Sequence, residues 1–280
     1  MIRKKDYKKL IDLAIEEDLD EKGDITSNAI FSTERSTFEL IARENGILCG
    51  LRIFSDIFSL LDPGCETINF VIDGDQIKKD QKICELNGLV VSILKGERTA
   101  LNFLSHLSGI ATKTYQFVKA CQGKTRILDT RKTIPGWRKL QKYAVKCGGG
   151  KNHRMGLYDL VMIKDNHIDA AGGISAAVKK VRKKWGYSFK IEVETRNIEE
   201  VKEAIKHDID IIMLDNMDLE QIKKALKIIN GKTDVEVSGN ITPNRIKEIS
   251  QLDVDFISVG SLTHSVKAFD FSLRKKYEKQ

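Results

Sequence analysis

The chain has 280 residues, 41% of them apolar, and its 47 basic and 40 acidic side chains give a net charge of +7. A chain of this size and apolar content can bury a large core, while three prolines and twenty glycines exclude collagen-like and low-complexity sequence. No apolar run reaches the ~18 residues of a membrane helix. Acidic residues follow the basic start where the apolar part of a signal peptide would lie, so we expect a globular protein without an export signal.

The five cysteines are scattered along the chain and include no C-x-x-C pair. This pattern argues against a disulfide framework and against a structural zinc site, because both need paired or closely spaced cysteines. We therefore expect free thiols and a location in the cytoplasm, where thiols stay reduced.

Residues 1–108 predict a mixed α+β domain. An amphipathic helix around 10–14, with its four apolar residues facing inward, is followed by strand-like segments at 37–42 and 89–94. Glycines separate these segments. The apolar stretch 101–107 then predicts a buried helix that leads into the second half of the chain.

From residue 125 onward, short apolar runs alternate with amphipathic stretches, and the starts of the runs are 19 to 35 residues apart. The runs are 125–129, 160–163, 190–193, 209–214, 234–237 and 256–259. Asn197, Asp218 and Thr242 precede three of the stretches as helix N-caps. This alternation predicts βαβ units, and six strands favour a TIM-like α/β barrel. A doubly wound sheet is the alternative, because periodicity alone does not show closure.

The positive charge is concentrated in one segment. Between Lys124 and Arg154 there are ten basic residues and one acidic residue, a net charge of +9, whereas the rest of the chain has a net charge of −2. This distribution predicts the binding of a strongly anionic ligand. For Lys139, Lys142 and Lys146, whose spacing puts them on one helix face, a solvated basic surface is the alternative.

Polar residues or glycines follow each of the six runs, where the active site of an α/β barrel lies. These residues are Thr130, Arg131, Lys132, Lys164, Asp165, Asn166, His167, Glu194, Asp215, Asn216, Ser238, Gly239, Asn240, Gly260 and Ser261. Because the carboxyl ends of parallel strands meet at one rim, we expect these side chains to converge. Any single one of them could be only a turn or a cap, but six such ends together indicate a site.

The residue types at this rim fit phosphate and magnesium chemistry. Glu194 and Asp215 supply two carboxylates, which suit Mg²⁺ bound together with substrate phosphate oxygens. Ion pairing of these acids with Lys164 or Arg131, without any metal, is the alternative. The glycine and serine pairs that close the last two runs lie where barrels commonly cradle a phosphate with backbone N–H groups.

The arginines of this region fit planar acids. Arg131 and Arg154 can each form a bidentate fork with a carboxylate, which lysine cannot reproduce. His153 follows a run of glycines and lies beside Arg154, so we interpret it as a further ligand donor. No histidine pair has metal-like spacing and no Ser/His/Asp set suggests a nucleophile, which argues against zinc chemistry and covalent catalysis.

Several stretches resemble the quinolinate phosphoribosyltransferases, also called nicotinate-nucleotide pyrophosphorylases. The stretches are "EDLDEKGDIT", "GERTALNFLSHLSGIAT", "DTRKTIPGWRKLQKYAVKCGGGKNHRMGLYDLVMIKDNHI", "IEVE", "MLDN", "VEVSGN" and "SVGSLTHS". The resemblance implies an N-terminal α/β sandwich (1–108), an incomplete α/β barrel (109–269) and a last helix (270–280) that packs back on the first domain. It also implies decarboxylating transfer of phosphoribosyl from phosphoribosyl pyrophosphate to quinolinate, with Mg²⁺, in NAD biosynthesis.

The resemblance further implies roles for individual residues, with Lys164, Glu194 and Asp215 as the catalytic set. The carboxylates of quinolinate would be held by Arg131, His153, Arg154 and Lys164, and by Arg98 from the partner subunit. The assembly would be a homodimer with shared active sites, or a higher oligomer. The ribose, pyrophosphate and Mg²⁺ would be served by Lys132, Glu194 and Asp215. The 5′-phosphate would be held by Ser238, Gly239, Asn240, Gly260 and His264.

Two positions depart from the family pattern, since Lys267 stands where proline is frequent and Asn240 where glycine is common. Both bear on loop shape near the phosphate. Within the enzyme class, the alternative is phosphoribosyl transfer to another pyridine or aromatic acid, as in a molybdenum-linked paralogous group. Outside it, the alternative is a nucleic-acid-binding protein with Trp137 and Tyr143 as stacking platforms, which two carboxylates at the rim disfavour. We expect neither a nucleic-acid nor a membrane partner.

Overall fold

The computed structural model describes residues 2–277, which form two compact units. Unit 1 combines the described residues up to Tyr115 with 134–149 and with those from Ser265 onward, and unit 2 consists of 116–133 and 150–264. Among the described residues, no helix is both long and apolar enough to span a bilayer.

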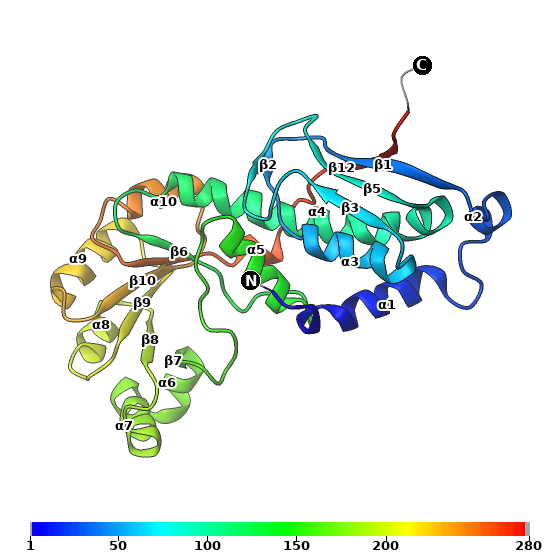
Figure 1. Ribbon diagram of the computed structural model, residues 1–280. Coiled ribbons are helices and arrows are strands. Elements are labelled where there is room, and N and C mark those ends of the chain that lie inside the picture. The colour runs from blue at the N-terminus through cyan, green and yellow to red at the C-terminus, as the bar shows by residue number, and fades with distance from the viewer. Residues whose placement is uncertain (1, 278–280) are drawn as a thin grey trace. The chain divides into compact units, whose positions relative to one another are not determined.

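Unit 1 is built on an antiparallel sheet of four strands in the order β12-β1-β5-β3, with a second sheet formed by β2 and β4. The strands are β1 (Arg35–Ala42), β2 (Gly46–Ile47), β3 (Glu66–Asn69), β4 (Gln76–Ile77), β5 (Lys82–Leu89) and β12 (Phe271–Lys275). The helices of this part are η1 (Lys4–Asp6), α1 (Lys8–Leu19), α2 (Ile25–Ile30), α3 (Leu51–Leu61), α4 (Val90–Ala120) and α5 (Arg138–Cys147). Helices α3 and α4 lie along one side of the larger sheet (Figure 1).

Two expectations for the N-terminal part need correction. Residues 89–94, expected as a strand, hold the end of β5 and the first turns of α4, where Val90 and Ile93 are buried one helical turn apart. Packing on this face outweighs the β-propensity of the branched residues. The expected helix near residue 10 is α1, in which Ile11 is buried, but Leu13 is 61% exposed and does not face inward.

The C-terminal segment is a strand and not the helix expected for 270–280. Strand β12 pairs antiparallel with β1, with Ala42 opposite Phe271 and Phe38 opposite Lys275. Its burial alternates, because Phe271 and Leu273 are buried while Ser272 between them is partly exposed. This period of two is typical of a half-buried strand. Residues 278–280 of the expected helix lie outside the described residues.

Unit 2 contains the parallel sheet that the alternating pattern predicts. Its six strands follow the order β6-β11-β10-β9-β8-β7. They are β6 (Arg126–Leu128), β7 (Val161–Ile163), β8 (Ile191–Thr195), β9 (Ile211–Asp215), β10 (Asp234–Ser238) and β11 (Phe256–Ser258), so all six predicted runs are confirmed. Strands β6 and β7, which follow each other in the chain, lie at opposite ends of the sheet. The barrel is therefore incomplete and open between them.

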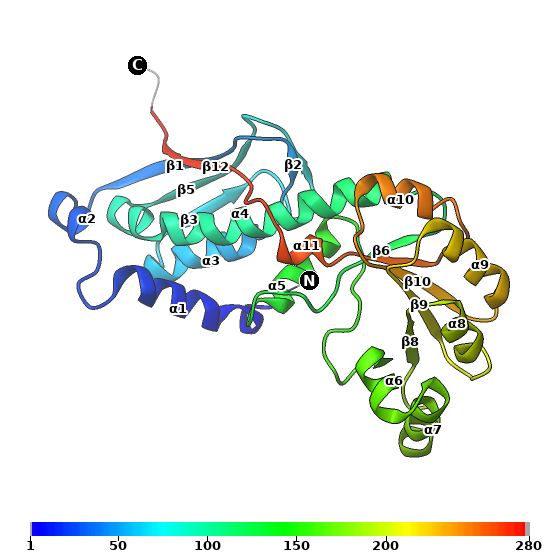
Figure 2. The same ribbon diagram turned by 180° about the vertical axis from the view of Figure 1, so that it is seen from behind.

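The helices of unit 2 follow the strands in turn. They are α6 (Asp165–Ala171), α7 (Ile174–Trp185), α8 (Ile198–Ala204), α9 (Leu219–Ile229), α10 (Pro243–Ile249) and α11 (Ser261–His264). Successive helices from α6 to α9 contact each other, and α8, α9 and α10 lie on the outer side of the sheet (Figures 1 and 2). This is the arrangement of a barrel-like fold.

The predicted N-caps of three of these helices are confirmed. The side chain of Asn197 accepts a hydrogen bond from a main-chain N–H of α8, Asp218 does the same for α9, and Thr242 for α10. Each cap satisfies an N–H group that has no partner within its helix, which typically stabilises a helix by ~1 kcal/mol.

Candidate active site

A pocket of about 820 Å³ lies in unit 2 at the carboxyl ends of the strands. The structure brings most of the residues singled out in the sequence to its wall. These are Thr130, Arg131, Lys132, His153, Arg154, Lys164, Glu194, Asp215, Ser238, Gly239, Asn240, Gly260, Ser261 and His264. Arg98, which lies on α4 in unit 1, does not line the pocket, and neither do Asp165, Asn166 and His167 at the start of α6.

The basic segment 124–154 divides between different environments. Arg131, Lys132 and Arg154 line the pocket. By contrast, Lys139 lies on α5 in unit 1, where its Nζ is 3.0 Å from an Asp6 carboxylate oxygen, and Lys142 of the same helix is buried. Only part of the charge excess therefore belongs to the pocket. The alternative of a solvated basic helix surface is wrong for Lys142, because this side chain is buried.

The cations of the pocket lie close enough to influence each other. Burial, and next the charge of Arg131, lower the pKa of Arg154 below its ordinary value. The Arg154 guanidinium donates to the carbonyl of Leu160 through Nη1 at 3.1 Å, and the buried Nε of Arg131 has no hydrogen-bond partner among the described residues. Two neighbouring guanidinium groups with spare donors in a partly buried wall favour the binding of an anion with planar oxygens.

The two rim carboxylates lie at the ends of the adjacent strands β8 and β9. Glu194 forms an ion pair with Lys164, which is the metal-free alternative considered for this residue. Asp215 accepts a hydrogen bond from the side-chain amide of Asn216 at 2.7 Å. Both carboxylates line the pocket and offer only oxygen ligands, so this donor set fits Mg²⁺ shared with the oxygens of a substrate.

The loop after β10 can hold only a small residue at its first turn. Gly239 has a φ of +96°, and a Cβ there would lie 2.1 Å from Oδ1 of Asn216. Asn240 follows with a φ of +49° and donates to the same Oδ1 at 3.2 Å. Asparagine tolerates this left-handed conformation better than most residues, which explains how it can stand where the family commonly has glycine.

The residues after β11 form the neighbouring part of the wall. The hydroxyl of Thr263 donates to the carbonyl of Lys132 at 2.7 Å and thereby ties α11 to the loop after β6. A Cβ at Gly260 would lie 3.0 Å from the Lys132 side chain and 3.2 Å from the ring of His264. Glycine thus lets the lysine, the histidine and the backbone of this loop gather at one place, which suits a phosphate.

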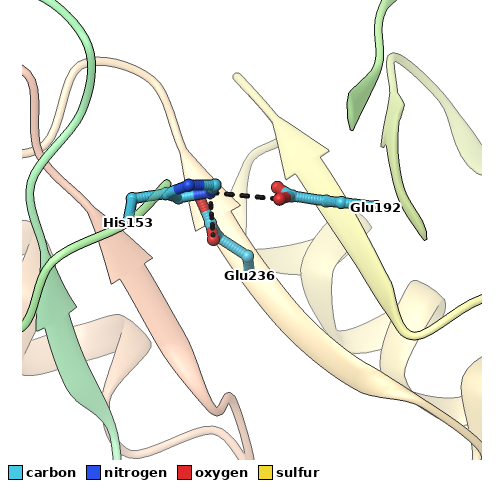
Figure 3. Close-up of side chains that lie close together, drawn as sticks. All are labelled: His153, Glu192 and Glu236. Carbon is cyan, nitrogen blue, oxygen red and sulfur yellow. Dashed lines mark ion pairs between the residues drawn. The ribbon is translucent and has the colours of Figure 1, made fainter. Parts of the chain in front are cut away.

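Glu236, a pocket residue that the sequence analysis did not single out, forms a cluster with His153 and Glu192 (Figure 3). Nε2 of His153 lies 3.1 Å from Oε2 of Glu192 and 3.3 Å from Oε2 of Glu236. Both glutamates are fully buried. The alternation of β10 places Glu236 on the same face as Ser238, and this signal could have identified it in the sequence.

The charges of this cluster depend on each other. Burial opposes a charged ring, but hydrogen bonding and charge from Glu192 and Glu236 outweigh it and raise the pKa of His153 to about 10. Burial, followed by the charge of Glu236, raises the pKa of Glu192 to about 7. The main-chain N–H of Arg154 faces Nδ1 at 2.6 Å and disfavours a proton there, yet two buried carboxylates outweigh one N–H dipole.

The sequence analysis gave no ligand role to the remaining wall residues, although it placed Asn216 at a strand end and Thr242 at a helix N-cap. They are Met162, Met213, Asn216, Ile241, Thr242, Ser258 and Val259. Most of them are apolar or neutral and end strands or begin loops, so their residue types gave no chemical signal. The two methionines, Ile241 and Val259 supply the apolar part of a pocket in which polar groups fix a ligand.

Comparison with known proteins gives a consistent result. The family model described as "Quinolinate phosphoribosyl transferase, C-terminal domain" matches residues 110–274, and the corresponding N-terminal model matches 24–108. A quinolinate phosphoribosyltransferase [decarboxylating] of Nicotiana tabacum is 43% identical over 96% of this chain and 82% of its own length. A probable nicotinate-nucleotide pyrophosphorylase [carboxylating] of Bacillus subtilis is 43% identical over 95% and 92%. The solved nicotinate-nucleotide pyrophosphorylase of Francisella tularensis superposes with a TM-score of 0.94 at 44% identity, covering 99% of this chain and 98% of that one.

Proposed function

This chain belongs to the quinolinate phosphoribosyltransferase family, and we propose that its pocket transfers phosphoribosyl from phosphoribosyl pyrophosphate to quinolinate. The products are nicotinate mononucleotide, pyrophosphate and CO2, and the reaction serves de novo NAD biosynthesis. The relatives' names describe this reaction from both directions, since one is called decarboxylating and the other a pyrophosphorylase. The observation that carries the proposal is the pocket itself, in which guanidinium groups, two carboxylates and a glycine-containing loop meet.

The arginines suit the acid substrate. Quinolinate carries two carboxylates on adjacent ring carbons, and Arg131 and Arg154 offer planar forks at the same wall. Lys164 can add a third positive charge, although in this structure it pairs with Glu194. We therefore assign these three residues to the quinolinate carboxylates, with neutralisation of a buried dianion as their task.

The two loops after β10 and β11 suit the 5′-phosphate of the other substrate. Gly239 and Gly260 let the backbone approach closely, and Ser238 and Ser261 add hydroxyl groups to the same wall. Backbone N–H groups gathered at such loops bind phosphate in many barrels. Lys132, held against this region, provides a positive charge for the ribose phosphate or the pyrophosphate.

We assign Mg²⁺ to Glu194 and Asp215, together with substrate oxygens, because both side chains line the pocket with oxygen ligands only. When bound, the ion would neutralise charge on the departing pyrophosphate. The pyridine nitrogen of quinolinate is already nucleophilic, so the side chains around it need not remove a proton. Their task is to hold the nitrogen in line with the anomeric carbon as that carbon gains positive character.

The loss of CO2 follows from the same chemistry. Once the ring nitrogen carries the ribose it is positively charged, and this charge stabilises the carbanion left at the adjacent carbon when the carboxylate departs. A proton then takes its place. The protein contributes mainly by positioning the ring and compensating charge.

The test is an incubation of the purified chain with quinolinate, phosphoribosyl pyrophosphate and Mg²⁺, with nicotinate mononucleotide and CO2 measured. We expect both products in equal amounts. Other pyridine and aromatic acids, tested in parallel, address the alternative of a different acceptor. A higher kcat/KM with one of them than with quinolinate would overturn the assignment of the substrate.

We further propose a homodimer in which Arg98 completes the site of the partner subunit. Support comes from the position of Arg98 on α4, outside unit 2 and its pocket, together with the role that the family resemblance implies. An ion pair with an acid of its own chain, such as Glu97, is the alternative.

Complementation tests the shared site. Arg98→Ala and Arg131→Ala proteins, each inactive alone, are mixed under conditions that allow subunit exchange. Partial recovery of activity is expected, because a mixed dimer would hold one site built from two intact halves. An absence of recovery despite demonstrated exchange contradicts the proposal.

We propose a cytoplasmic location for this chain, although the tobacco relative carries a mitochondrial name. The support is that all five cysteines are unbridged, as expected for a reducing compartment. Fractionation of cells that express the tagged chain tests this proposal, and recovery in an organelle or outside the cell would refute it.

A further inference from the structure

The segment that carries His153 and Arg154 lies at the open edge of the barrel. Lys151 forms a parallel bridge with Leu128 of β6, donating from its main-chain N to the carbonyl of Ile127 at 2.8 Å. Its own carbonyl accepts from the N–H of Asp129 at 3.1 Å. The segment therefore takes a place beside β6 on the side where the barrel is not closed.

Three buried acids from different parts of the sheet hold the next two residues. Asp129, directly after β6, accepts from the side-chain amide of Asn152 at 2.5 Å and from the main-chain N–H of His153 at 2.9 Å. Glu192 of β8 and Glu236 of β10 face the ring of the same histidine (Figure 3). His153 is thus held at its backbone by one acid and at its side chain by two.

Both ring nitrogens of His153 have neighbours within the protein. Nε2 lies between the two glutamates, and Nδ1 lies 2.6 Å from the main-chain N of Arg154. The residue that follows is Arg154, whose guanidinium lines the pocket and is held by the carbonyl of Leu160. Because the backbone and the ring of His153 are both held, the position of the neighbouring Cα of Arg154 is held as well.

We propose that Glu192 and Glu236 are positioning residues for the acid-binding part of the pocket: they hold His153 from inside the barrel, and His153 sets the position of Arg154. This rests on the proposed function, through the assignment of Arg154 to a quinolinate carboxylate. It gives His153 a part in holding Arg154 besides the contact with quinolinate that the family resemblance implies.

Charge repulsion and the proposed positioning role predict opposite effects of the same substitution on the affinity for quinolinate. A carboxylate near an anion site repels the anion, so by charge alone Glu192→Gln would tighten the binding of quinolinate. Positioning predicts weaker binding, because the ion pair between Glu192 and the charged ring of His153 is lost and a neutral amide holds the ring less firmly. Glu192 suits this comparison since it is fully buried and does not line the pocket.

The experiment measures the steady-state kinetics of the full-length Glu192→Gln enzyme with both substrates. We expect the KM for quinolinate to rise about tenfold, which corresponds to ~1.4 kcal/mol. The kcat and the KM for phosphoribosyl pyrophosphate should stay within about threefold, because a shift of Arg154 affects the acid more than the phosphate loops. Glu199→Gln, the same change at an exposed residue of α8, is the control and should behave like the wild type.

A second readout follows the histidine itself. In wild-type protein with ¹⁵N-labelled histidine, we expect the His153 ring to keep its proton to a pH above the ordinary range of an imidazole. Glu192→Gln should lower the pH at which this ring titrates. Glu192→Asp, which keeps the charge, should restore this titration at least in part. If Glu192→Gln does not fold, Glu236→Gln is measured in the same way.

The two readouts separate this proposal from the proposed function. If the wild type does not use quinolinate, the proposed function fails, and the histidine titration still tests the hold of the two acids on His153. If the wild type is active, an unchanged or lower KM for quinolinate in Glu192→Gln overturns the positioning role. An unchanged titration of His153 in the glutamate variant would contradict the proposal that the two glutamates hold its ring.

Discussion

The turn at Gly239 allows a quantitative test of the proposed phosphate loop. Gly239→Ala forces an alanine into the left-handed region, which costs ~1–2 kcal/mol. It also places a Cβ 2.1 Å from Oδ1 of Asn216, so that side chain must move and lose its hydrogen bond with Asn240, about 1 kcal/mol more. We expect a total loss of ~2–3 kcal/mol in the free energy of unfolding.

Gly172→Ala is the matched control. Gly172, after α6, has a φ of +87°, and nothing lies within 4 Å of the position of a Cβ there. It should lose only the backbone part, ~1–2 kcal/mol, and keep wild-type kinetics.

Urea unfolding and steady-state kinetics of both variants decide the matter. We expect Gly239→Ala to be about 1 kcal/mol less stable than the control and its KM for phosphoribosyl pyrophosphate to rise about tenfold, since the backbone of the loop moves with Asn216. Equal stability of the two variants, together with an unchanged KM, would refute both the steric reasoning and the phosphate assignment.

Three further predictions concern single side chains. Arg131→Lys keeps the charge but loses the planar fork, so we expect a roughly tenfold higher KM for quinolinate, with Arg274→Lys on β12 as an unaffected control; equal KM values would remove Arg131 from the acid site. Glu194→Gln and Asp215→Asn should each raise the Mg²⁺ concentration needed for half-maximal activity, and wild-type activity and Mg²⁺ dependence in both would exclude the metal assignment. The raised pKa of His153 stabilises the fold fully below the unfolded-state pKa of ~6.5, and this stabilisation is lost as the pH rises through about 10. The difference in unfolding free energy between wild type and His153→Asn should therefore shrink from pH 7 to 10, and a constant difference would contradict the ion pairing.

The fold of the C-terminal half could be predicted because its strands are short and mostly buried, and because the helices between them are amphipathic and three of them begin at a recognisable N-cap. All six runs became strands of one parallel sheet. The errors lie elsewhere, in segments whose partners are distant in the chain. Residues 89–94 are rich in β-branched residues, yet packing makes most of them the start of α4. Strand β12 exists because β1, more than 200 residues earlier, offers it an edge.

The wall of the pocket could be predicted for a related reason. In a parallel barrel every strand end reaches the same rim, so polar residues such as Arg131, Glu194 and Asp215 converge whatever the details of packing. The sequence suggested Lys164 or Arg131 as partners of the rim acids, but it could not decide between them. The choice of Lys164 as the partner of Glu194, and of His153 as the partner of two glutamates, depends on the three-dimensional positions of strands and loops.

The open edge of the barrel explains why acids lie inside it. Closed barrels fill their interior mainly with branched apolar side chains, but β8 and β10 carry the fully buried acids Glu192 and Glu236. Where β6 and β7 fail to meet, the segment from Lys151 to Arg154 enters with N–H groups and an imidazole that need acceptors away from water. Asp129 and the two glutamates supply these acceptors. An apolar residue at either glutamate position would leave the buried ring of His153 with fewer partners. The two buried acids are therefore needed because the barrel is open and this segment enters at the gap.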